Sequence, residues 1–256
     1  MNRSLALLAA LAASFVAVPA AMAANPLKPE KFVFDPARGY ILVRVGPVGD
    51  SGNADPVYFV RMDPAHPGQT LWSFGMRPIN SKKESDAAMV WGGDNFGNDG
   101  KTSLYLVPVN PGEWVIGGAG GTSMSLGSYG FTVKPGEITY VGTILTGREN
   151  GKSDIPEIKA ATLSQDLVEF GTLMNIVMSD AILVTPSAAG DPIPEAIASH
   201  GVTHASLIPG VRFNNFLAAM INRAIGLEEL EHQLPAVVDS QGAAEAPEAP
   251  STPSGY

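Results

Sequence analysis

The sequence has no cysteine among its 256 residues. Disulfide bonds, thiolate metal ligands and a lipid-carrying cysteine are therefore excluded. A protein without such links depends on its hydrophobic core for stability, and that requires a chain of sufficient length. More than 200 residues follow the first 23, which is enough for one large domain or two small ones.

Charged residues are also scarce, at 16% of the chain, and basic residues are the minority among them. Removal of Arg3 with the first 23 residues leaves 15 basic against 25 acidic residues, a net charge of −10. Such a chain is repelled by nucleic acids and anionic lipid surfaces. We expect no nucleic-acid partner and no stable membrane anchor.

Long apolar runs are absent except at the N-terminus. Arg3 precedes an apolar run over Leu5–Val18, Pro19 ends it, and Ala21-Met22-Ala23 forms a small-x-small cleavage pattern. The run is shorter than the ~20 residues of a membrane-spanning helix. Residues 1–23 are predicted to be a signal peptide cleaved near Ala23, which places the mature protein in a periplasm or outside the cell. An uncleaved N-terminal anchor is the alternative.

Residues 24–150 are predicted to form an antiparallel β-sandwich of about 7–9 strands, because short β-branched and aromatic runs alternate with Gly, Pro, Asn and Asp. The expected strands are Lys31–Phe34, Tyr40–Val45, Val57–Arg61, Leu71–Phe74, Ala88–Trp91, Ser103–Pro108, Trp114–Gly117, Gly130–Val133 and Ile138–Leu145.

Two Pro-Gly turns carry the clearest hairpin signals, at Asn110-Pro-Gly-Glu113 and Lys134-Pro-Gly-Glu137. Proline presets the first central residue of a type II turn, and glycine accepts the positive φ of the second. Each turn is predicted to join two paired strands. In the strand after the second turn, strict alternation places Ile138, Tyr140, Gly142 and Ile144 on one face.

These turns and their flanking residues, Pro111-Gly-Glu-Trp114 and Tyr129-Gly-Phe-Thr-Val-Lys-Pro-Gly-Glu-Ile-Thr-Tyr-Val-Gly142, resemble a family of exported bacterial β-sandwich domains of unknown function. In that family a PGxY strand precedes an F.V.PGE.YYVG hairpin. The resemblance implies a small antiparallel sandwich behind a signal or lipoprotein sequence, and it supplies no functional residues. This chain departs from the family in lacking a lipoprotein cysteine and in having a long C-terminal extension.

The second part of the chain, residues 151–235, is predicted to be a helical extension packed on the sandwich, with a separate small domain as the alternative. Apolar residues at helical spacing predict a helix over 163–178, and two shorter helices are expected, one between Asp191 and Gly201 and one from Asn214 or Asn215 to Gly226. Residues 236–256, rich in Ala, Pro, Glu, Ser and Gly, are predicted to be a disordered tail.

No catalytic motif is found. The closest approach to a nucleophile elbow, Gly121-Thr-Ser-Met-Ser, lacks its second glycine, so only a triad assembled from scattered residues stays open. The histidines are His66, His200, His204 and His232. Gly201 lies between His200 and His204, so we expect the helix to end there and predict no metal site.

Two loops resemble known ligand-binding loops in composition, but each lacks a residue or element that the ligand requires. Asp94–Gly100 is rich in oxygen ligands, but Leu106 stands where a calcium loop needs its glutamate. Gly117–Gly121 follows a strand, yet neither a helix nor a lysine accompanies it as in nucleotide-binding loops. We predict a polar turn for the first, and a strand connection or close backbone approach for the second.

Trp91, directly before Gly92-Gly93-Asp94, is the best candidate for a loop aromatic that contacts a ligand, although core or rim packing is the favoured interpretation. Trp114 and Tyr140 are predicted to be core residues. We expect an exported, non-enzymatic accessory or binding protein of the bacterial cell envelope with no cofactor, whose partner is another envelope protein or a saccharide. The alternatives are a carbohydrate- or peptide-binding module, which needs two or more exposed aromatics, and a hydrolase with a scattered site.

Overall fold

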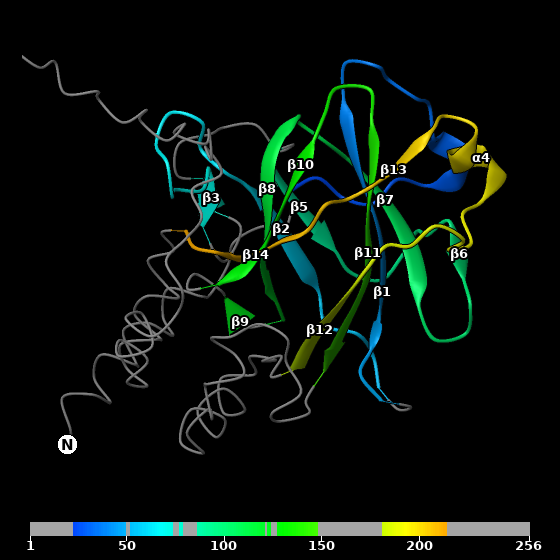
Figure 1. Cartoon of the computed structure of the whole chain (residues 1–256). Coiled ribbons are helices and arrows are strands. Elements are labelled where there is room, and N and C mark those ends of the chain that lie inside the picture. Colours follow the sequence, from blue (N-terminus) through cyan, green and yellow to red (C-terminus); the bar gives the residue numbers. More distant parts are fainter. Residues whose placement is uncertain are drawn as a thin grey trace, which may run out of the picture.

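The computed structural model describes residues 23–49, 52–73, 77–78, 86–120, 122–123, 127–147 and 181–213. These residues are mostly β, and they form two six-stranded sheets and a two-stranded sheet (Figure 1). The two larger sheets pack on each other in a sandwich-like arrangement. The predicted signal peptide before Ala23, the helices over 163–178 and 214–226, and the tail 236–256 all lie outside the described residues.

One sheet, called sheet I, has the order β12-β11-β1-β7-β6, and β13 pairs with the other half of the β11 edge. Its pairs β1–β11 and β11–β13 are parallel and the others antiparallel. The expectation of an antiparallel sandwich therefore fails for this sheet. Its strands are β1 (Gly39–Pro47), β6 (Gly97–Asn98), β7 (Ser103–Val109), β11 (Ile138–Gly147), β12 (Ala181–Pro186) and β13 (Val202–His204).

The other sheet, called sheet II, has the order β14-β10-β8-β2-β5, with β9 paired to the end of β8, and all these pairs are antiparallel. Its strands are β2 (Val57–Arg61), β5 (Ala87–Val90), β8 (Gly112–Ala119), β9 (Thr122–Ser123), β10 (Ser128–Val133) and β14 (Ile208–Val211). The two-stranded sheet consists of β3 (Trp72–Ser73) and β4 (Arg77–Pro78).

Eight of the nine predicted strands coincide with β1, β2, β3, β5, β7, β8, β10 and β11, with small differences at their ends. The strand predicted over Lys31–Phe34 is wrong. The 3-10 helix η2 (Pro29–Lys31) lies there instead, followed by an extended segment outside both sheets. Phe32 and Phe34 are partly buried and Val33 is 80% exposed. This alternation of buried and exposed side chains arises because the segment packs against a face of sheet I, and the segment pairs with no described strand.

The Pro-Gly turn predicted at Lys134–Glu137 is present, whereas the one predicted at Asn110–Glu113 is a bend at Pro111, because Gly112 already begins β8 with φ +144°. Neither site closes a hairpin. The bend at Pro111 joins β7 of sheet I to β8 of sheet II, and the turn at Lys134–Glu137 joins β10 of sheet II to β11 of sheet I. At the second turn Gly136 has φ +65°, and the Glu137 N–H donates to the Lys134 carbonyl at 3.3 Å, as in a type II turn. Turn chemistry therefore located the reversals without showing which strands pair.

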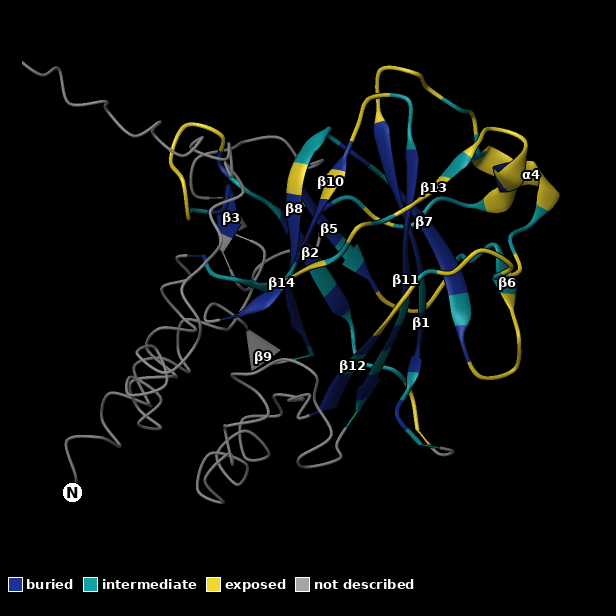
Figure 2. Ribbon diagram, in the orientation of Figure 1, coloured by how far each residue is buried: buried dark blue, intermediate teal, exposed yellow. Residues whose placement is uncertain are grey.

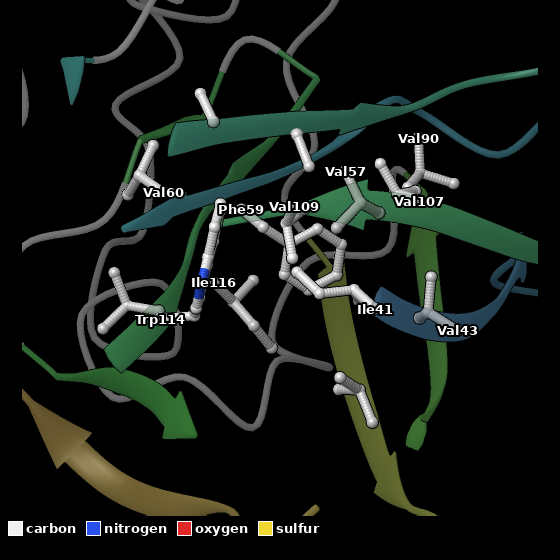
Figure 3. Close-up of a cluster of buried hydrophobic side chains, with 14 of the residues drawn as sticks. Ile41, Val43, Val57, Phe59, Val60, Val90, Val107, Val109, Trp114 and Ile116 are labelled. Atoms are coloured by element: carbon white, nitrogen blue, oxygen red, sulfur yellow. The ribbon is translucent and has the colours of Figure 1, made fainter. Parts of the chain in front are cut away.

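The inner core lies between the two sheets and takes side chains from both (Figure 3). Phe59 of β2 and Phe131 of β10 meet edge to face at a centroid distance of 5.9 Å. Trp114 is buried as predicted, and its indole N–H donates to the Asn110 carbonyl at 3.0 Å. Burial of apolar area on this scale is the main contribution to stability in a chain without disulfides.

A second apolar cluster, called the outer cluster, covers the opposite face of sheet I. It contains Tyr40, Leu42, Leu104, Leu106, Ile138, Tyr140 and Ile197, with Leu27, Phe32, Phe34, Phe96, Ile193 and Val202 packed against them. Tyr140 is buried as predicted. Apart from Phe96, which lies just before β6, the covering residues come from the segment before β1 and from the segment around α4 (Glu195–Ala198), which lie side by side in Figure 1. Figure 2 shows buried strands in the middle of sheet I and exposed residues concentrated in α4 and the loops.

Residues 181–213 differ from the helical extension predicted for 151–235. They form three strands, which extend both sheets, and one helix of four residues, α4. Gly201 ends this helical segment with φ +77°, as its sequence predicts. Short strands such as Val202–His204 escape a sequence search because they pair with distant residues, here Ile138–Tyr140 of β11.

Candidate functional site

Trp91 follows β5 directly, and its side chain is 63% exposed. It is the one exposed Phe, Tyr or Trp among the residues whose burial is described. Trp72 and Trp114 are fully buried. Large aromatic side chains are usually buried, and an exposed one offers a flat apolar face to a ligand.

The loop that carries Trp91, here the Trp91 loop (residues 91–96), connects sheet II to sheet I and is held at several points. Gly92 and Gly93 have φ of +51° and +75°, which turns the chain sharply after the tryptophan. Asp94 forms an ion pair with Lys28 at 3.2 Å. Phe96 packs edge to face against Phe32 at 5.8 Å. The loop therefore presents Trp91 from a defined backbone.

The predicted polar turn over Asp94–Gly100 is divided by β6, and its last part, which carries Asp99, forms a polar turn between β6 and β7. Asp99 accepts hydrogen bonds from the N–H groups of Lys101 (2.9 Å) and Thr102 (2.6 Å) and from the Thr102 hydroxyl (2.7 Å). The N–H and hydroxyl of Thr102, then the N–H of Lys101, lower the pKa of Asp99 from 3.8 to about 2, and Arg44 contributes less. The Asp99 carboxylate therefore stabilises the turn through these hydrogen bonds.

The glycine-rich run after Trp114 lies largely within β8, so its use is structural. A Cβ at Gly117 would lie 3.0 Å from the Val60 side chain, beside a register shift between β8 and β2. Gly120 has φ +56° and its N–H donates to the Pro56 carbonyl. This is the close backbone approach that the sequence predicts.

His200 and His204 do not share a ligand site. His200 stacks on Phe34 at a centroid distance of 4.7 Å and meets Phe32 edge to face. His204 lies in β13, with its ring 6.0 Å from that of Tyr140. His232 lies outside the described residues. Within the described part of the chain, no three His, Asp or Glu side chains are grouped so as to hold a metal ion.

His66 forms a pair that sequence reasoning missed. Its Nδ1 lies 2.9 Å from a carboxylate oxygen of Asp63, whose other oxygen accepts the Ala65 N–H at 2.9 Å. Asp63 is buried and the His66 side chain is 59% exposed, so the carboxylate orients a ring that faces solvent. The Asp63-Pro64 turn signal with a histidine at the fourth position could have indicated this pair.

Tyr140 of the outer cluster lies close to two charged side chains, Arg44 and Asp191. The Tyr140 hydroxyl is buried, close to these side chains. Burial raises the pKa of Tyr140, the Asp191 carboxylate raises it further, and the Arg44 guanidinium lowers it. A tyrosine whose pKa is raised keeps its proton at neutral pH and so does not act as a base there. Arg44 itself donates to the Pro192 carbonyl at 2.7 Å. These residues meet from distant parts of the chain, so no local sequence signal marks them.

Comparison with known proteins gives no match to a family model, to a curated protein or to a solved structure. No helix of the described residues has the length and apolar character needed to cross a membrane.

Proposed function

We propose that this protein is an exported, non-enzymatic binding protein of the bacterial cell envelope, and that Trp91 contacts its ligand. The observation that carries the proposal is the exposure of Trp91 on a loop braced by the Lys28–Asp94 ion pair and the Phe32–Phe96 contact. A braced loop loses little conformational entropy when it binds, so it favours recognition. The periplasmic or secreted location rests on the signal-peptide pattern of residues 1–23.

The ligand that fits best is a segment of another envelope protein or a peptide. A saccharide-binding face would stack sugar rings on two or more exposed aromatics, and the described residues supply one. A single tryptophan suits an apolar side chain or one ring of a larger ligand. A saccharide ligand is therefore the second choice within the same proposal.

Soluble peptidoglycan fragments test the proposal, because they carry both a saccharide and a peptide. We expect the disaccharide-peptide fragment to change the fluorescence of the mature protein at saturable concentrations, and a Trp91→Ala variant to lose this response. The peptide without sugar should retain the response and the disaccharide alone should not. Binding by the Trp91→Ala variant with unchanged affinity would contradict the proposal.

A hydrolase is the second candidate function, favoured by the Asp63–His66 pair. Asp63 and His66 supply the acid and the histidine of a nucleophile–histidine–acid triad, and a nucleophile is the third member that such a site needs. The test is turnover of simple ester and amide substrates by the wild-type protein and by His66→Ala. Activity lost in His66→Ala and retained in Trp91→Ala would favour the hydrolase over the binding protein.

A further inference from the structure

The segment that follows the predicted cleavage site is built into the edge of sheet II. The Ala24 N–H donates to the Ala87 carbonyl at 2.9 Å, and the Met89 N–H donates to the Ala24 carbonyl at 3.1 Å. Ala24 thereby forms a parallel bridge to Ala88 on the side of β5 opposite β2. Ala23 is 4% exposed and belongs to the inner core. Ala23 is therefore held by packing in the inner core, and Ala24 by backbone hydrogen bonds to β5.

The same segment then crosses to sheet I and covers its outer face. The Leu27 N–H donates to the Leu106 carbonyl of β7 at 2.8 Å. Phe32 and Phe34 enter the outer cluster, where both contact the ring of His200. The chain between Ala24 and Phe34 is called the N-terminal strap. It connects the β5 edge of sheet II to strand β7 and to the outer cluster of sheet I.

We propose that the Ala23–Ala24 bond is a proteolytic processing site that the fold itself protects, so that cleavage has to precede docking of the N-terminal strap. This inference rests on the exported location proposed above. Hydrolysis adds one water across the bond, and it leaves a carboxylate on Ala23 and an ammonium on Ala24. The ammonium keeps a donor for the Ala87 carbonyl, so the strap docks after cleavage with the same backbone partner.

The protection has a direct physical cause. A peptidase binds its substrate as an extended strand and needs access to the backbone on both sides of the scissile bond. Here the N–H and the carbonyl of Ala24 already pair with β5, and the Ala23 side chain is buried. Cleavage of the folded precursor therefore requires local opening, and its rate follows the population of the open form. We expect it to be at least about 100-fold slower than cleavage of the unfolded chain.

The experiment compares three full-length precursors with a purified signal peptidase in detergent. The first is the wild-type chain, and the second is a Phe59→Asp/Ile41→Asp variant that circular dichroism shows to be unfolded. The third carries a Gly-Ser linker of about ten residues between Ala23 and Ala24, which keeps Ala21-Met22-Ala23 but moves the cut outside the fold. N-terminal sequencing identifies each product.

We expect rapid cleavage of the unfolded and linker precursors and slow cleavage of the folded wild-type precursor, with Ala24 as the new N-terminus of the unfolded variant. A folded wild-type chain cut as fast as the unfolded one would overturn the inference. So would a folded linker precursor that resists equally. If the unfolded precursor is not cut after Ala23, the exported location fails, which separates that failure from failure of the protection.

Discussion

Val43 of β1 lies opposite Gly142 of β11, whereas its neighbour Leu42 lies opposite Tyr140. Val141 is therefore the additional residue of a β-bulge in the parallel pair. Before the bulge Ile138 and Tyr140 face the outer cluster, and after it Ile144 faces the inner core together with Val141. The prediction that Ile144 shares a face with Ile138 and Tyr140 is wrong for this reason. The bulge allows one strand to serve both clusters.

Replacement of Gly142 by alanine should destabilise the fold by about 3 kcal/mol or more. Gly142 has φ +112°, and a Cβ there would lie 2.5 Å from the Ser187 nitrogen and 2.7 Å from the Pro186 carbonyl carbon. Gly97→Ala is the matched control in the same sheet, because a Cβ at Gly97 meets no atom within 4 Å. Urea denaturation measures both variants. Similar losses in the two would contradict the bulge geometry.

Asp99 should make the β6–β7 turn sensitive to acid. Its pKa is lowered from 3.8 to about 2, so its contribution to stability is fully present above 3.8 and is lost as the pH falls through about 2. We expect Asp99→Asn to be less stable than wild type at neutral pH, and the difference to shrink between these two values. A Thr102→Val variant, which removes one donor, should raise the pKa of Asp99. Carboxyl-carbon NMR titration checks both pKa values, and an unshifted Asp99 would count against the turn described above.

The stacked pair of Phe34 and His200 should couple the N-terminal strap to the segment around α4. The rings are 4.7 Å apart and 10° from parallel. A double-mutant cycle with Phe34→Ala and His200→Ala should give a coupling energy of about 0.5–1.5 kcal/mol. Phe34→Ala combined with His66→Ala serves as the control pair, because His66 bonds Asp63 in another loop. Additive effects at Phe34 and His200 would show that the strap is held by other contacts.

Local sequence signals located most strands, the turn at Lys134–Glu137, the chain direction change at Pro111, the core positions of Trp114 and Tyr140, and the helix end at Gly201. They did not show that the turns cross between sheets, because the same Pro-Gly geometry serves a hairpin and a crossing. Nor did they show β12, β13 and β14, whose partners lie far away in the sequence. For the candidate site, the glycines that follow Trp91 indicate its loop position in the sequence, whereas Lys28 and Phe32, which brace its loop, are brought to it only by the fold.

The most direct test of the role proposed for Trp91 is the indole region of a ¹H–¹⁵N spectrum of the mature protein, which should show one signal for each of Trp72, Trp91 and Trp114. Trp91→Phe assigns its own signal, which should exchange rapidly with water because this side chain is 63% exposed while the other two are buried. Addition of the disaccharide-peptide fragment of peptidoglycan, and of its peptide without sugar, should shift the Trp91 signal and leave the two buried indoles in place. An unchanged Trp91 signal at saturating fragment, with binding detected elsewhere in the spectrum, would contradict the account.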